Sequence, residues 1–291
     1  MIKKITTKLR ALLNGHTSIA LENARRIQQI SAIAVASELD RLANQEPRSL
    51  DALRLTKFER KVFSQSGEDG ILREIYRRIG TTNQYFIEFG VETGLENNTA
   101  CCLISGWRGL WIEASAASYA KASENYAREI DANRLKIICR AVTPDNVEEL
   151  FKQGGAPEEP DLLSIDIDGN DIYVWKAITS YRPRVIVVEY NSIFPPPQRW
   201  AVVEDPNYGS SMTSHFGASL SSFCDVAADK GYVLVGCSLS GVNAFFVRKD
   251  LAHPNQFAAP FSAENHYEPP RYYLIRDWVG HPRETGPYVM K

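Results

Sequence analysis

The sequence lacks an excess of charge of either sign, a long apolar run and paired cysteines. Its 291 residues carry 33 lysines and arginines against 35 aspartates and glutamates, a formal net charge of −2. A chain without a basic excess has no long-range field that attracts nucleic acid, so we expect no nucleic-acid partner. No segment is apolar over the length that spans a bilayer. Polar residues interrupt the first apolar positions before they reach the length of a signal peptide: Thr6, Thr7, Lys8 and Arg10.

The cysteines form an odd set without the spacing of metal ligands. They are Cys101, Cys102, Cys139, Cys224 and Cys237. We interpret them as reduced core thiols of a cytoplasmic protein, because intracellular proteins keep their cysteines reduced. The apolar content of 44% indicates a globular chain, and the length allows one large domain or two small ones.

Residues 1–50 are predicted to form a helical arm outside the main domain. Their apolar residues recur at helical spacing, and Asn14-Gly15 predicts a break between two helices. One interpretation is an oligomerisation or packing arm, which would make the protein a homo-oligomer. The other is weak peripheral attachment, in which basic side chains lay the first helix on an anionic membrane surface. The basic residues are Lys3, Lys4, Lys8 and Arg10, and the periodic apolar residues are Ile2, Ile5, Leu9, Leu12, Ile27, Ile30, Ala34, Leu39 and Leu42.

Between residues 51 and 252, strand-like and helix-like segments alternate, as in a mostly parallel α/β sheet covered on both faces. Strands are predicted at 85–89, 109–113, 136–141, 162–166 and 185–189, and a terminal hairpin at 232–236 and 244–248. Helices are predicted at 70–79, 98–105, 118–130, 147–152, 172–179 and 219–230. Five parallel strands followed by a hairpin is the order of the Rossmann-like, seven-stranded class I methyltransferase sheet. Residues 253–291, which include Trp278 and are rich in proline and aromatic residues, are predicted to be a tail that packs on this domain.

The segment Phe86–Gly94 reads Phe-Ile-Glu-Phe-Gly-Val-Glu-Thr-Gly, an apolar strand followed by a glycine turn with two carboxylates. Such a turn brings the backbone close to a nucleotide cofactor, and Gly90 and Gly94 are predicted to allow that approach. A dinucleotide motif needs a third glycine and a pyrophosphate at a helix N-terminus, where Glu88 and Glu92 would repel it. The two carboxylates fit S-adenosylmethionine instead, because its sulfonium and ammonium groups are cationic.

Other strand ends add predicted cofactor contacts. Glu113 ends the second strand, 25 positions after Glu88, near the spacing at which an acidic residue binds ribose hydroxyls. The end of the third strand is predicted to line the adenine, and the turn 64–70 to fold over the methionine end, with helix capping as the alternative for this turn. The contacts predicted besides Glu88, Gly90, Glu92, Gly94 and Glu113 are Gln65, Ser66, Glu68, Thr99, Ala114, Arg140, Ala141 and Asp166.

Acidic and amide groups also follow the fourth and fifth predicted strands. They are Asp166, Asp168, Asn170 and Asp171 after the fourth, and Glu189 and Asn191 at the end of the fifth. The ligand crevice of an open α/β sheet lies beyond the carboxyl ends of its strands. Oxygen ligands suit Mg²⁺, and we predict Asp166, Glu189 and Asn191 as its ligands. The alternative is structural, with these groups shaping the turn, capping the next helix and bonding to neighbouring backbone.

Methyl transfer from a sulfonium is an in-line displacement, so the protein chiefly aligns donor and acceptor and removes a proton. A base is needed only when the acceptor is a hydroxyl. His215, in the loop 209–217, is one predicted catalytic residue, because a neutral histidine accepts a proton. Asp166, Asp168 and Glu189 are the competing candidates.

These segments together resemble the FkbM-type family of S-adenosylmethionine-dependent methyltransferases, especially members encoded with glycan biosynthesis genes. The resemblance implies a class I methyltransferase fold, S-adenosylmethionine as donor and often a sugar hydroxyl as acceptor. It also implies that Glu88, Gly90 and Glu113 contact the cofactor and that Asp166 lies beside the transferred methyl. Related turns usually have a small residue where this chain has Glu92. The likeness covers roughly residues 63–250 and rests on Ser64–Gly70, Phe86–Gly90, Gly106–Glu113, Leu163–Asp171, Val187–Asn191 and Asn243–Arg248.

The leading hypothesis is an O-methyltransferase acting on a sugar hydroxyl of a glycan or nucleotide-sugar intermediate, with or without a divalent metal. A methyltransferase with a nitrogen or carboxylate acceptor is one alternative. A metal-dependent hydroxylase on the same sheet is disfavoured, since the five histidines show no two-histidine iron-binding pattern. A non-catalytic scaffold is the third alternative, and the presence of every acidic cofactor position argues against it.

Overall fold

The computed structural model describes residues 2–205, 213–275 and 288–290. The chain forms two compact units, Met1–Glu46 and Pro47–Lys291. Among the described residues, none of the helices combines the length and the apolar character that crossing a bilayer requires. All five cysteines are free, and Cys139 is exposed, so the prediction of core thiols is wrong for that residue.

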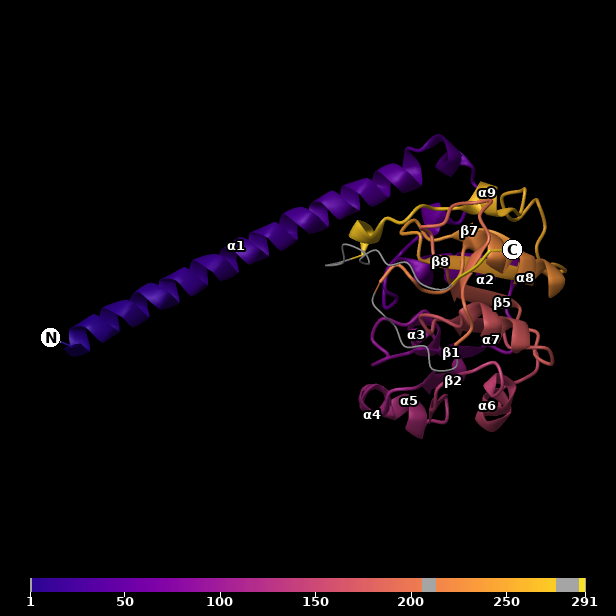
Figure 1. Ribbon diagram of the computed structural model, residues 1–291, viewed down its shortest axis with the longest axis horizontal. Helices are drawn as coiled ribbons and strands as arrows, with labels where there is room; N and C mark the ends of the chain where they lie inside the picture. The colour runs from indigo at the N-terminus through magenta and orange to yellow at the C-terminus, as the bar shows by residue number, and fades with distance from the viewer. Residues whose placement is uncertain (1, 206–212, 276–287, 291) are drawn as a thin grey trace. The chain divides into compact units, whose positions relative to one another are not determined.

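The first unit contains α1 (Ile2–Asn44), one continuous helix (Figure 1). The predicted break at Asn14-Gly15 is therefore wrong. A glycine in a helix interior costs about 1 kcal/mol relative to alanine, which is small beside the many helical residues of the long segment that contains it. Glu22 and Arg26 form an ion pair one turn apart, with a separation of 2.6 Å.

Seven strands form the main sheet of the second unit, in the order β3-β2-β1-β4-β5-β8-β7. They are β1 (Tyr85–Phe89), β2 (Arg108–Glu113), β3 (Leu135–Cys139), β4 (Leu162–Ile165), β5 (Val185–Glu189), β7 (Tyr232–Cys237) and β8 (Asn243–Arg248). The first five are parallel, and β8 pairs antiparallel with both β5 and β7. This is the class I methyltransferase sheet that the sequence predicts, and every predicted strand is present.

Helices cover both faces of this sheet. They are α2 (Glu68–Ile79), α3 (Ala100–Ile104), α4 (Ala116–Asn125), α5 (Ala127–Asp131), α6 (Val147–Gly154), α7 (Asp171–Ala177) and α8 (Leu220–Asp229). Figure 1 shows α4 and α5 at the β2 end of the sheet and α8 at the β7 end. The helix predicted at 118–130 is two helices, because the chain leaves helical geometry at Tyr126, whose ring packs against Trp111.

The two faces of the sheet carry separate apolar cores. Ile87 and Phe89 of β1 pack with side chains of α6, α7 and α8. Phe86 of β1 and Trp111 of β2 pack with side chains of α2 and α3 on the other face. Because side chains alternate along a strand, Glu88 lies on the α2 face with Phe86. The same alternation determines on which face of the sheet each polar side chain at a strand end lies.

The elements that the sequence did not predict are short. They are the 3-10 helices η1 (Pro47–Leu50), η2 (Thr56–Phe58) and η3 (Tyr272–Leu274), the helix α9 (Ala263–His266) and the strand pair β6 (Trp200–Val202) and β9 (Tyr288–Met290). The C-terminal segment bonds to the main domain, since Arg271 N donates to Ser240 O and Tyr267 Oη to Ser192 O. Trp278 lies outside the described residues.

Candidate functional site

A row of carboxylates lies along the carboxyl edge of the sheet, on the α2 face. We call Glu113, Glu88, Asp166 and Glu189 the acidic row. Phe89 pairs with Ile112 and Ile165, and Ile165 pairs with Val188, so Glu113, Asp166 and Glu189 follow at one edge. Glu88 lies one residue before Phe89, level with Trp111 and Ser164. Four adjacent strands thus direct acidic side chains toward the crevice where open α/β sheets bind their ligands.

Asp166, Asp168 and Glu189 form the tightest part of this edge. One carboxylate oxygen of each lies within 4.8 Å of the others. Asp166 and Glu189 are half-buried and Asp168 is exposed, with a left-handed backbone at φ 61°. Within the described part of the chain, no hydrogen bond reaches the carboxylate of Asp166 or Glu189.

Burial is the main cause that raises the pKa of Asp166 and of Glu189 well above the usual range, and the neighbouring carboxylates raise both further. Like charges this close cannot all ionise without a compensating cation or proton. A cationic ligand would supply that compensation. The cluster therefore selects for positive charge, whether from an organic cation or from a hard metal ion.

Glu88 is fully engaged with the loop that follows β1. Its Oε1 accepts from Asn98 N at 2.9 Å, and its Oε2 accepts from Thr99 N at 3.1 Å and from the Thr99 hydroxyl. Thr99 Oγ1 in turn accepts from Trp111 Nε1 at 2.7 Å. Burial raises the pKa of Glu88, and these hydrogen bonds oppose that shift. Glu88 and Thr99 therefore hold the loop, and the contact of Glu88 with a cofactor stays a prediction.

Glu113 joins the loops after β1 and β2. Its Oε2 accepts from Glu92 N and its Oε1 from Ser115 N, both at 2.7 Å. Each oxygen keeps a lone pair for a hydroxyl donor. Glu92 has a left-handed backbone at φ 46°, and burial followed by the charge of Asp168 raises its pKa. Glu113 thus remains suited to ribose hydroxyls, and Glu92 adds to the negative charge of the site.

The two glycines of the turn serve contacts within the protein. A Cβ on Gly90 would lie 1.6 Å from the carbonyl oxygen of Asp166, and its φ is 76°. A Cβ on Gly94 would lie 2.8 Å from the Tyr126 ring and 2.9 Å from the Trp111 ring. The Tyr126 and Trp111 rings occupy the side on which a Gly94 side chain would lie, and the approach of the Gly94 backbone to a cofactor stays a prediction. Gly90 brings the β1 turn into contact with the β4 end, where the acidic row is densest.

The turn before α2 is organised by two buried carboxylates. Glu68 Oε2 accepts from Ser66 N and Gly67 N, and its Oε1 accepts from Asn243 Nδ2 at 3.0 Å. Asn243 lies opposite Glu189 in the pairing of β5 and β8, so the turn is bonded to the site edge. Glu68 therefore shapes the turn, in line with the structural alternative.

Asp69, the next residue, was missed by the sequence analysis. Its Oδ2 accepts from the backbone of Val62, Phe63 and Ser64 and from the Ser64 hydroxyl. The Asp-Gly ending of the predicted motif was the signal that could have identified it. Gln65 is bound through its backbone oxygen to Lys61 Nζ, and the Ser66 hydroxyl bonds to that of Ser240.

Asn191 has a structural role. Its Nδ2 donates to Ser214 O and Phe216 O, and its Oδ1 accepts from Ile193 N. These bonds attach the segment that carries His215 to Asn191. Asn191 lies two residues after Glu189, the last residue of β5. The carboxylate that lies with those of Asp166 and Glu189 is that of Asp168, and the predicted metal site itself stays a prediction.

His215 contacts Trp200, with ring centroids 5.9 Å apart in an edge-on arrangement. Trp200 also stacks on Phe194 at 4.2 Å. Residues 209–212 of the predicted loop lie outside the described residues. Phe194, Trp200 and His215 thus form an aromatic group in the chain that follows β5.

The remaining predicted contacts separate into two groups. Asp171 accepts from Ile167 N and Gly169 N, which confirms the structural alternative for this residue. Burial raises its pKa to about 6. Ala114, Arg140 and Ala141 are exposed beyond β2 and β3, at the edge where the adenine is predicted.

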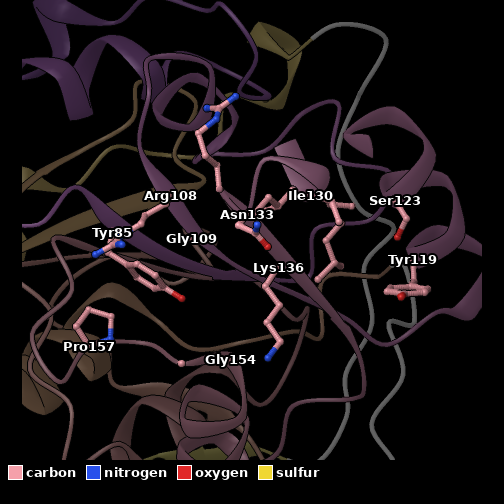
Figure 2. Close-up of a pocket in the computed structure, with 14 residues that line it drawn as sticks. Tyr85, Arg108, Gly109, Tyr119, Ser123, Ile130, Asn133, Lys136, Gly154 and Pro157 are labelled. Atoms are coloured by element: carbon pink, nitrogen blue, oxygen red, sulfur yellow. The ribbon is translucent and has the colours of Figure 1, made fainter. Parts of the chain in front are cut away.

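A cavity of about 640 Å³ lies at the amino ends of the strands, on the side of the sheet away from the acidic row (Figure 2). It is lined by Tyr85 and Arg108, which begin β1 and β2, and by Lys136 in β3, the edge strand. These residues lie at the amino ends of the parallel strands, whereas the acidic row lies at the carboxyl ends. We therefore assign the cavity no part in the chemistry of the acidic row.

No protein-family profile and no curated protein sequence matches the chain. Solved structures of methyltransferases are similar at low identity. The pyocyanin biosynthetic protein PhzM is 13% identical with a TM-score of 0.36, over 61% of this chain and 54% of that one. The methyltransferase domain of bacterial CtHen1-C is 14% identical with a TM-score of 0.41, over 63% and 97%.

Magnesium protoporphyrin IX methyltransferase (ChlM) from Synechocystis PCC 6803, with bound SAM, is 7% identical with a TM-score of 0.40, over 62% and 77%. This chain spans about half of the length of PhzM and of the METTL16 methyltransferase domain. The fold assignment rests on the strand order of this chain.

Proposed function

We propose that the protein is an S-adenosylmethionine-dependent O-methyltransferase of the FkbM type that acts on a sugar hydroxyl of a glycan or nucleotide-sugar intermediate. The observation that carries this proposal is the cluster of Asp166, Asp168 and Glu189 at the carboxyl edge of a class I sheet. Two of its carboxylates have raised pKa values and lack hydrogen bonds within the described chain. A site of this kind favours a cationic donor over a phosphate-bearing one.

The residues around the β1 turn fit such a donor. Glu113 keeps acceptor capacity for ribose hydroxyls, and Glu88 and Glu92 add negative charge without a phosphate-binding glycine motif. When bound, S-adenosylmethionine supplies a methyl group on a sulfonium leaving group. The chain then has to align the acceptor and take up its proton.

For a hydroxyl acceptor, the proton would pass to Asp166 or Glu189, because a raised pKa makes each carboxylate a stronger proton acceptor than an ordinary one. The same oxygens, with Asp168, are of the type that Mg²⁺ prefers, and a bound Mg²⁺ would lower the pKa of the acceptor hydroxyl. Half-buried Phe194 and His215 beside Trp200 support a sugar acceptor, because aromatic faces pack well on the apolar faces of sugar rings.

Methyl transfer from a donor with a labelled methyl group tests this function directly. We would offer nucleotide sugars, oligosaccharides and, as comparison acceptors, primary amines and carboxylates, each with Mg²⁺ and with EDTA. Label in a sugar methyl ether supports the proposal, and its loss in EDTA supports the metal. Label only in amines or esters, or no transfer to any acceptor at saturating donor, contradicts it.

Replacement of Glu113 by glutamine is expected to weaken donor binding about tenfold. Glu113 accepts a hydrogen bond from each of two backbone N–H groups, and the NH₂ group of glutamine would face one of them without an acceptor. The variant would also lack the negative charge beside the ribose. The measurement is the rise in unfolding midpoint that a fixed concentration of S-adenosylmethionine produces. Midpoints without ligand separate the structural cost from the binding loss. An equal ligand-induced rise in wild type and variant would remove Glu113 from the binding site.

A further inference from the structure

The continuous helix α1 has an apolar face that is exposed to solvent in the part whose side chains the structure describes. Ile27 is 67% exposed and Ile30 is 68% exposed, far more than isoleucine in a packed helix. Ala20, Ala24 and Ala34 recur with them at spacings of three and four, which places all five on one face. The periodic apolar positions at the start of the sequence continue this spacing, because no break interrupts the helix.

The opposite side of the described part carries the charged residues. Arg25 and Arg26 lie three and four residues after Glu22, and Arg26 neutralises Glu22 in an ion pair. Ile33 also lies on this side, 70% exposed. The helix therefore separates these charged residues from the face that contains Ile27 and Ile30.

The charge of this segment differs in sign from that of the rest of the chain. Residues 2–44, the whole of α1, contain seven basic residues and three acidic residues, a net charge of +4. The whole chain has a net charge of −2, so the remaining residues carry −6. Two copies of a +4 helix repel each other, which disfavours pairing of α1 with itself. A basic helix with a face of isoleucine and alanine side chains fits a surface whose outer layer is anionic and whose interior is apolar.

We propose that α1 binds in the plane of an anionic lipid bilayer, with the face that contains Ile27 and Ile30 in the lipid. Such helices bury their apolar face at the boundary between headgroups and acyl chains, while Lys and Arg interact with anionic headgroups. The apolar face favours a lipid bilayer over nucleic acid as the partner, because binding to nucleic acid would require only the basic side chains of the helix. The attachment would bring the domain to acceptors held at a membrane, and it is independent of the methyl-transfer proposal.

Co-flotation of the full-length protein with lipid vesicles tests this inference. We expect binding to vesicles of phosphatidylcholine with 30% phosphatidylglycerol, and at least about tenfold weaker binding to phosphatidylcholine alone. Ile30→Asn should lower the partition coefficient about tenfold, and Ile33→Asn should leave it within about twofold of wild type. The two variants make the same substitution three residues apart at equally exposed positions, so their effects on helix stability match.

Three results would overturn the inference. One is failure of wild type to float with the anionic vesicles in low salt. Another is equal loss of binding in the Ile30→Asn and Ile33→Asn variants. The third is sedimentation of the lipid-free protein as a stable oligomer that Ile30→Asn dissociates, since the apolar face would then be covered by a second copy.

Discussion

Replacing Asp166 by asparagine is expected to reduce methyl transfer at least about a hundredfold and, at the same time, to stabilise the ligand-free protein above pH 7. The loss of activity follows from removing a carboxylate at the centre of the cluster with Asp168 and Glu189. The gain in stability follows because Asp166 is desolvated and faces like charges. An amide of the same shape removes that repulsion, which we expect to add about 1 kcal/mol to the free energy of unfolding.

The sign of the pH dependence is set by the raised pKa values. Asp166 and Glu189 hold protons more tightly in the folded protein than in the unfolded chain. Their contribution to stability is complete below the unfolded pKa of about 4 and is lost as the pH rises through the folded values. Urea unfolding of the ligand-free protein between pH 5 and 8.5 should show a flatter decline for the Asp166→Asn variant than for wild type.

Asp171→Asn is the matched control, since it makes the same substitution five residues later. The Asp171 carboxylate accepts from Ile167 N and Gly169 N, so the amide should destabilise the protein by about 1–2 kcal/mol. At pH 8 the free energy of unfolding should rise in the Asp166→Asn variant and fall in the Asp171→Asn variant. This difference in sign distinguishes a ligand-binding carboxylate from a structural one. If Asp166→Asn also destabilised the ligand-free protein, or left activity intact, the functional assignment of Asp166 would be wrong.

Replacing Gly90 by alanine is expected to destabilise the protein by about 3 kcal/mol or more and to abolish donor binding. The added Cβ would lie 1.6 Å from the carbonyl oxygen of Asp166, so the turn after β1 must separate from the end of β4. That movement changes the geometry of the carboxylate cluster as well as the stability of the fold. Urea unfolding and calorimetric titration with S-adenosylmethionine measure the two effects.

Gly80→Ala provides the control for backbone strain alone. Gly80 has φ 68°, close to the 76° of Gly90, but no atom lies within 4 Å of its added Cβ. We expect this variant to lose about 1–3 kcal/mol, because its ψ of 177° and its positive φ together form a conformation that only glycine adopts without strain, and to bind the donor as wild type does. Similar losses in both variants would show that the clash with the Asp166 backbone does not govern the Gly90 position.

The sheet could be predicted from the sequence because its strands have local signals. Runs such as 85–89 and 185–189 are short, apolar and bounded by turns, and their predicted limits match the structure. The break at Asn14-Gly15 was wrong because one glycine is a weak signal against a long helical pattern. The pair of β6 and β9 was missed because its partners are far apart in the sequence, so neither has a local period.

The acidic character of the site was also predictable, since parallel strands bring their carboxyl ends to one edge. The role of each side chain was not. Asn191 and Glu68 have the same chemistry as ligand-binding residues, yet both are occupied by hydrogen bonds to distant segments. Only the three-dimensional arrangement shows that, among the residues the structure describes, Asp166 and Glu189 lack such bonds, whereas Asp171 has them.

Calorimetric titration of the wild-type protein with S-adenosylmethionine, in two buffers with different ionisation enthalpies, tests the central claim most directly. If the acidic row binds the cationic donor, the titration should show saturable binding with release of protons, because the cation lowers the raised pKa values of Asp166 and Glu189. S-adenosylhomocysteine, which lacks the sulfonium charge, should release fewer protons. No saturable binding up to millimolar donor would contradict the account.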